Sequence, residues 1–281
     1  MTRSGMGLAL LAIMLLAVLP AAPARAQPTR TFVAAQGNDG NPCTYAAPCR
    51  TFQHAHDVVA SGGEIDVLDP AGYGALTISK AISIQGHGYS GITATGGATA
   101  ITITAGASDK INLRGLLLDG AGTGGTGVTF SSGGSLNIQE SLIRNFASHG
   151  LALQPGAAST LAVSDSVIAH NGGAGIFVGV PGGGTATVAL NRVDVVANNA
   201  GLSASGAGAS NVMVRDALIG NNATTGILVN AANAVLRMAH CTISGNATGL
   251  QIASGVLHSY GDNNIDGNGT NGSPTDVISF H

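Results

Sequence analysis

Two carboxylates separated by 25 residues, Glu140 and Asp165, are the residues of this sequence best placed for acid–base chemistry. Each lies four residues after the start of a repeated sequence unit, so stacking the units as parallel strands would bring them within about 5 Å of each other. Retaining glycosidases hold their two carboxyl groups at a similar separation. Because neighbouring carboxylates repel each other, we expect the pKa of one of them to rise. The pair is therefore a candidate acid–base pair.

The same position in the later units also carries charged or titratable residues. It holds Arg192, Asp216 and His240, and we expect Asp262 to follow. Asp216, His240 and Asp262 would form a carboxylate–imidazole cluster, which makes His240 a third candidate catalytic residue and places Arg192 and Asp216 beside it as candidate binding residues. The alternative is a solvated column of mixed charges in which Arg192 separates like charges, and exposed ion pairs of that kind contribute little.

A second candidate binding surface lies on the strand that follows the Gly of each unit. Its outward position holds Phe177 and Leu228 in two of the units. We expect both to be exposed apolar groups on a flat sheet, where an aromatic ring can support a ligand. Scattered apolar residues are also normal on protein surfaces, so the alternative is a surface without a ligand.

The element that must position these residues is a repeat of 22 to 27 residues. Each unit contains three short apolar segments with period-two alternation, which is typical of β-strands. Three strands within one such unit cannot pair with one another, but they can pair with the equivalent strands of the next unit. We therefore expect stacked parallel sheets, with an Asn in a left-handed corner of most units. The units begin at Ile111, Leu136, Leu161, Val188, Val212, Leu236 and His258.

The chain divides into three segments. Residues 1–26 have the pattern of a cleaved signal peptide, which predicts a secreted or periplasmic protein without a membrane span after cleavage. Residues 27–63 hold a first strand, a polar loop and a helix over Thr51–Ser61 that we expect to cap the repeat, with His54 and His56 as ordinary surface and lid residues. Residues 64–281 form the repeat itself.

The cysteines and the charge limit the possible functions further. Cys43 and Cys49 predict a disulfide that pins the polar loop in an exported protein, with free thiols or a metal site as the alternatives. Cys241 is expected to be a buried thiol. The formal net charge is −3, which argues against a nucleic-acid partner. No cofactor and no metal are predicted.

Several runs near the N-terminus resemble the entry to the right-handed parallel β-helices of the pectate-lyase-like superfamily. The segments around the first two cysteines, Asn41–Cys43 and Pro48–Arg50, resemble uncharacterised bacterial secreted proteins of that superfamily. The likeness implies an all-β fold, a right-handed parallel β-helix with three parallel sheets and a short capping helix. Its members include lyases, hydrolases, epimerases and adhesins, so activity stays open. The runs are Thr51–Ala55, Gly62–Val67, Gly72–Gly74, Ile78–Lys80 and Ile82–Ile84.

Two functions remain open at this point. The first is a protein without catalytic activity that contacts a polysaccharide or a cell-surface glycan. The second is a polysaccharide-modifying enzyme, a lyase, hydrolase or epimerase, that uses Glu140, Asp165 and His240. The short steps between units leave few residues for the walls of a cleft, and the longest insertion, Pro181–Ala186, is small. This favours the first function.

Overall fold

The computed structural model describes residues 26–279. The segment predicted as a signal peptide therefore lies outside the described residues, apart from its last residue. Within the described range, no helix has the length and apolar character needed to cross a bilayer.

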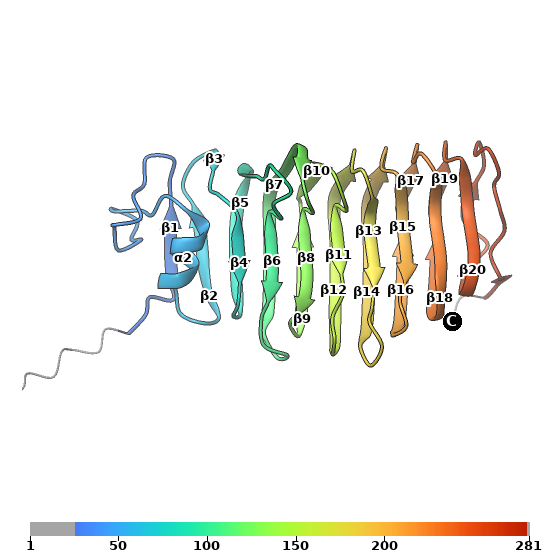
Figure 1. Cartoon of the computed structure of the whole chain (residues 1–281), viewed down its shortest axis with the longest axis horizontal. Helices are drawn as coiled ribbons and strands as arrows, with labels where there is room; N and C mark the ends of the chain where they lie inside the picture. The colour runs from blue at the N-terminus through green and yellow to red at the C-terminus, as the bar shows by residue number, and fades with distance from the viewer. Residues whose placement is uncertain (1–25, 280–281) are drawn as a thin grey trace, which may run out of the picture.

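The chain winds into a right-handed parallel β-helix, a rod of stacked coils (Figure 1), as predicted. Successive coils pair in parallel, and several long strands bend at a corner and so belong to two faces. The strands are β1 (Arg30–Val33), β2 (Gly63–Val67), β3 (Ala71–Gly72), β4 (Leu76–Ile78), β5 (Ile82–Thr93), β6 (Ile101–Thr104), β7 (Lys110–Gly124), β8 (Val128–Ser132), β9 (Ser135–Gln139), β10 (Leu142–Phe146), β11 (Leu151–Leu153), β12 (Ala158–Ala169), β13 (Ala174–Gly179), β14 (Thr185–Val196), β15 (Ala200–Ser205), β16 (Ala209–Arg215), β17 (Leu218–Gly220), β18 (Thr225–Ala239), β19 (Thr242–Ser244), β20 (Thr248–Ser259), β21 (Asn264–Ile265) and β22 (Asp276–Val277).

Three faces run along the rod. The first face consists of the first part of β7, β9, the first half of β12, the first half of β14, β16 and the last part of β18. The second face carries β10, β17 and β19 with the second parts of the bent strands β7, β12 and β14. The third face carries β8, β11, β13, β15 and the first half of β18.

The predicted register is confirmed along most of the first face and is wrong at its end. Each predicted unit start pairs with the next as far as Leu236. Leu236 then pairs with Leu257, and His258 pairs with Arg237. The last unit therefore starts one residue earlier than predicted, because an inward-facing leucine, not a histidine, continues the core.

A ladder of asparagine side chains runs inside the corner between the second and third faces. Asn171 Oδ1 accepts from the N–H of Phe146 at 3.1 Å, and each later side-chain oxygen accepts from the backbone N–H of the Asn one coil before it, at 3.0 Å. Asn271 ends the ladder, because its Oδ1 accepts from the N–H of Asn268 at 3.2 Å. The members are Asn171, Asn198, Asn222, Asn246 and Asn268.

The expectation that these asparagines adopt the left-handed conformation is wrong. The residue just before each Asn has the positive φ instead, as His170 (57°) and Ala197 (55°) do. The Gly that follows is required by close packing: a Cβ on Gly175 would lie 2.7 Å from the Nδ2 atom of Asn198. Each Asn occupies its position because of its side-chain hydrogen bonds. The left-handed corner is formed by the residue before it.

Helix α2 (Phe52–Val58) covers the N-terminal end of the rod, in a shorter span than predicted (Figure 1). The side chain of Thr51 caps it by accepting from the N–H of His54 at 3.2 Å. Phe52 is fully buried, and its ring lies 5.0 Å from that of Tyr73. His56, expected to be an ordinary surface or lid residue, is buried in the lid, and its Nε2 accepts from the N–H of Ser79 at 3.3 Å. The helix therefore closes the apolar core, as the open end of a solenoid requires.

Candidate functional site

A column of left-handed residues forms the corner between the first and second faces. Five of its members are exposed, as expected, and all have φ between 49° and 65°. A non-glycine residue in this region is uncommon, and Asp and His tolerate it better than most. The requirement for a positive φ therefore accounts for some of the residue types found in this column. Its members are Gly115, Glu140, Asp165, Arg192, Asp216 and His240.

Glu140 and Asp165 each pair with an arginine. Glu140 Oε1 accepts from Arg114 at 2.7 Å. Asp165 accepts from Nε and Nη2 of Arg192 at 2.6 and 2.9 Å. The hydrogen bond from Arg192 lowers the pKa of Asp165, so the expected rise from carboxylate crowding is wrong for this residue. The catalytic role of the pair stays a prediction.

The imidazole of His240 lies between two carboxylates, as the sequence predicts. Its Nδ1 is 3.6 Å from Asp216 Oδ1, and its Nε2 is 3.1 Å from Asp262 Oδ2. Asp262 does not occupy the corner, because the shift of register gives that position to Gly261 (φ 84°). The side chain of Asp262 instead lies beside the corner, 19% exposed, and its Oδ1 accepts from the N–H of His240 at 3.1 Å.

Two open grooves lie on the first face. The first crosses β14, β16 and β18, and the second crosses β14 and β16. Their volumes are about 290 and 390 Å³. The first is lined by Thr187, Asn211 and Arg237 among others. The second includes Arg192 and Asp216, two of the three residues predicted to bind a ligand. We call the two together the first-face groove.

Arg237 has a different electrostatic environment from the other arginines of the groove. Arg192 pairs with Asp165, and Arg215 Nε lies 3.2 Å from Asp216 Oδ2. Arg237 donates from Nη1 to the amide oxygen of Asn211 at 2.7 Å, and no carboxylate between residues 26 and 279 forms an ion pair with it. Its positive charge is therefore not neutralised within the described chain.

Sequence reasoning missed Arg237, Asn211 and Thr187. They lie on the strands of the first face and not in the corner column. The period-two pattern of the strands could have identified them as outward-facing residues. Asn211 and Arg237 alternate with the inward-facing Val212, Leu236 and Met238.

Phe177 lies on the third face, away from the first-face groove, and is partly buried. Its ring stacks on that of His149, with centroids 4.6 Å apart and planes at 7°. His149 Nδ1 accepts from the N–H of Ala174 at 3.0 Å, and burial lowers its pKa. The expectation of a freely exposed aromatic group is therefore wrong, because the imidazole covers one side of the ring.

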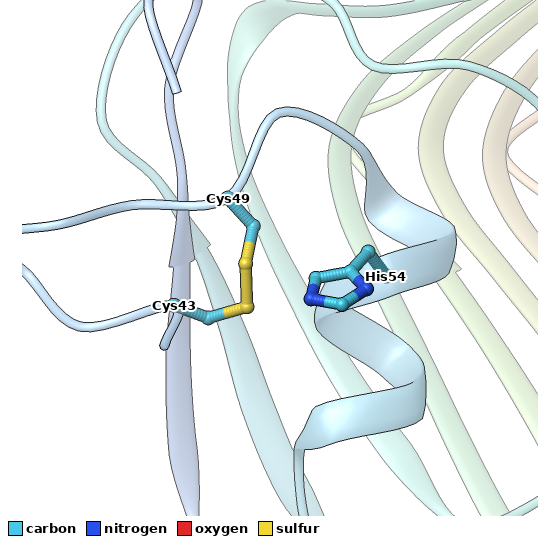
Figure 2. Close-up of side chains that lie close together, drawn as sticks. All are labelled: Cys43, Cys49 and His54. Carbon is cyan, nitrogen blue, oxygen red and sulfur yellow. A yellow bond between two sulfur atoms is a disulfide. The ribbon is translucent and has the colours of Figure 1, made fainter. Parts of the chain in front are cut away.

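The disulfide between Cys43 and Cys49 is confirmed, with the Cα atoms 4.7 Å apart. Figure 2 shows the imidazole of His54 beside the two sulfur atoms. The sulfurs and a ring nitrogen of His54 all lie within 4.8 Å of one another. The polar loop is thereby held against the start of helix α2.

Comparisons with known proteins agree with the fold. Residues 121–269 match the family model described as the right-handed beta helix region. No curated protein matches the sequence. The fold resembles that of pectate lyase Pel9A, at 15% identity and a TM-score of 0.58, over 89% of this chain and 76% of that one. It also resembles ORF18 of Geobacillus virus E2, at 13% identity and a TM-score of 0.56, over 100% of this chain and 65% of that one. The family match spans more than half of the sequence, and the chain belongs to the right-handed β-helix family.

Proposed function

We propose that this protein is exported and binds a polysaccharide or a cell-surface glycan along the first-face groove without cleaving it. The observation that carries the proposal is the unneutralised guanidinium of Arg237 beside Asn211, on an open face of regular strands. The disulfide supports export, since disulfides persist mainly in oxidising compartments.

The chemistry of the groove suits a hydroxyl-rich chain. A guanidinium presents five N–H donors in a rigid plane, and it binds carboxylates through two parallel hydrogen bonds. Asn211 and Thr187 add an amide and a hydroxyl, which both donate and accept. Because adjacent strands repeat every ~4.8 Å, the groove offers these groups at regular intervals along the rod. An extended polymer can contact several of them at once.

The alternative function is a polysaccharide-modifying enzyme that uses Glu140, Asp165 and His240. The position of His240 between two carboxylates favours it. The arginine partner of Asp165 argues against it, because a carboxyl group with a lowered pKa stays ionised and is a weak general acid. The short loops between coils also leave the groove open to water. Binding without cleavage is therefore the better-supported function.

The test is size-exclusion chromatography of the chain from Gln27 onward with a panel of acidic and neutral polysaccharides. We expect one polymer to elute with the protein at its original length, and Arg237→Ala to weaken that binding by at least about tenfold, or ~1.4 kcal/mol. Arg144→Ala is the matched control, because Arg144 lies on the second face and pairs with Asp119.

Two results would contradict the proposal. If a polymer becomes shorter, the protein is an enzyme, and Glu140→Ala then tests the carboxylate pair. If no polymer of the panel elutes with the protein, or if the two arginine variants weaken binding equally, the first-face groove is not a glycan site.

A further inference from the structure

The N-terminal cap brings two sulfur atoms and an imidazole together at the N-terminal end of the rod, far from the first-face groove (Figures 1 and 2). Cys43 lies in the polar loop, Cys49 precedes helix α2, and His54 lies within that helix. Their three potential ligand atoms lie within 4.8 Å of one another. No residue that lines the first-face groove belongs to this cluster.

The donor set matches that of a thiolate-rich zinc site. Zinc in proteins is bound tetrahedrally by cysteine sulfur at ~2.3 Å and histidine nitrogen at ~2.0 Å. Two sulfurs on one such ion lie about 3.8 Å apart by this geometry, which is within the span of the cluster. Once the disulfide is reduced, the two sulfurs and the imidazole therefore lie within reach of one ion.

The surroundings of the sulfurs also suit a metal ion. Cys43 and Cys49 are 1% and 0% exposed, so water competes weakly for an ion between them. The carbonyl oxygen of Asn41 lies 3.7 Å from Cys49 Sγ and 4.0 Å from Cys43 Sγ, where it can supply a fourth ligand. Within residues 26–279, the imidazole of His54 forms no hydrogen bond or ion pair that would occupy its ring nitrogens. The ring is half-buried and is held beside the sulfurs by the helix.

We propose that Cys43, Cys49 and His54 form a binding site for one soft divalent cation of the zinc type, open in the dithiol form and closed by the disulfide. In the open form, the ion takes two thiolates and the imidazole, and the two thiol protons are released to solvent. A thiol-oxidising system that takes two electrons from the two thiolates forms the S–S bond, releases the ion and so closes the site. A trialkylphosphine reopens it: phosphine, water and disulfide give two thiols and the phosphine oxide.

The test is titration of Co²⁺, as a spectroscopic substitute for Zn²⁺, into the chain from Gln27 onward after anaerobic reduction with a phosphine. Cys241→Ala serves as the background, so that every thiol signal comes from Cys43 and Cys49. We expect one Co²⁺ per chain, with a thiolate-to-cobalt charge-transfer band and the visible bands of tetrahedral cobalt, all displaced by Zn²⁺. The oxidised protein is expected to give none of these bands.

A histidine variant separates a built site from two thiols that bind metal without the imidazole. We expect His54→Ala to weaken Co²⁺ binding by about tenfold or more, the loss typical when a group around a metal is removed. His87→Ala is the matched control, because His87 is exposed on another coil. The proposal is wrong if the reduced chain gives no charge-transfer band, or if His54→Ala binds Co²⁺ as tightly as its parent. In the second case the two thiols bind the ion without the imidazole, and the three residues do not form one site.

Discussion

Substituting Asn222 tests the asparagine ladder most directly. Its side chain is 1% exposed and takes part in four hydrogen bonds. The oxygen accepts from N and Nδ2 of Asn198 at 3.0 and 3.3 Å. The amide nitrogen donates to the carbonyl oxygen of Val195 at 3.2 Å and to Asn246 Oδ1 at 2.8 Å. Asn222→Ala removes all four and leaves buried partners without hydrogen bonds.

The expected loss follows from these contacts. A hydrogen bond contributes about 1 kcal/mol net, so four contribute roughly 3–4 kcal/mol. For a chain of this length, 1 kcal/mol shifts the melting temperature by about 2–4 °C. We therefore expect Asn222→Ala to lower the melting temperature by roughly 10 °C. The loss is measured by thermal and urea unfolding followed by far-ultraviolet circular dichroism.

The matched control is Asn199→Ala, in the preceding coil. Asn199 is exposed, and the hydrogen bonds seen for it in the described chain are made by its backbone. Its substitution should change the free energy of unfolding by less than about 0.5 kcal/mol. The double variant Asn222→Ala with Asn246→Ala should lose less than the sum of the single variants, because the two share hydrogen bonds. If Asn222→Ala costs no more than Asn199→Ala, the ladder does not stabilise the coils.

Three further predictions concern titratable groups. Burial raises the pKa of Cys241 to about 11, so at pH ~8 its thiol should react with an aromatic disulfide reagent far more slowly in native than in urea-unfolded protein; equal rates would contradict its burial. Burial alone would raise the pKa of Asp119, but hydrogen bonds, including one from Arg144, lower it overall. Wild type should therefore be more stable than Asp119→Asn at neutral pH, and urea unfolding should show this advantage shrinking as the pH falls below ~3.9 through the lowered folded pKa; a pH-independent difference would show that the charge is not responsible. Phe177→Ala should raise the pKa of His149 towards 6.5, because burial is what lowers it; an NMR titration that finds no rise would mean that Phe177 does not cause this burial.

The fold can be predicted from the sequence because the packing requirements of each coil are local and recur in every coil. Inward positions such as Leu161, Val188 and Val212 must be apolar in every coil, since each packs on its equivalents above and below. This produces a periodic pattern that a single chain displays without any comparison. The disulfide between Cys43 and Cys49 is predictable for a different reason, because two cysteines this close in sequence can pair across a short loop.

The corner asparagines show where the same reasoning fails. Asn tolerates the left-handed region, so a repeated Asn next to Gly indicates a left-handed corner. Here the side-chain amide of Asn198 donates to Asn222 Oδ1 in the next coil, and Ala197 takes the left-handed conformation. Local propensity and a long-range ladder both select Asn, and the positive φ of Ala197 shows that the ladder is the reason here. The pairing of Glu140 with Arg114 was unpredictable for the same reason, because it depends on which long side chains meet across coils.

The residue types at the end of the repeat indicate the correct register of the last coil, which a fixed residue count misses. The corner position requires a positive φ in every coil, which favours Gly wherever no other residue is selected. In the last coil, Gly261 and Asp262 are adjacent, and a fixed count of four from His258 selects Asp262. The requirement for φ selects Gly261, and moving the unit start back by one residue also places Leu257 in the core. Asp262 then lies beside the corner, close to the imidazole of His240. The contact between an aspartate and His240 was therefore predicted correctly from a register that was wrong by one residue, because a side chain on either side of the corner can reach the imidazole.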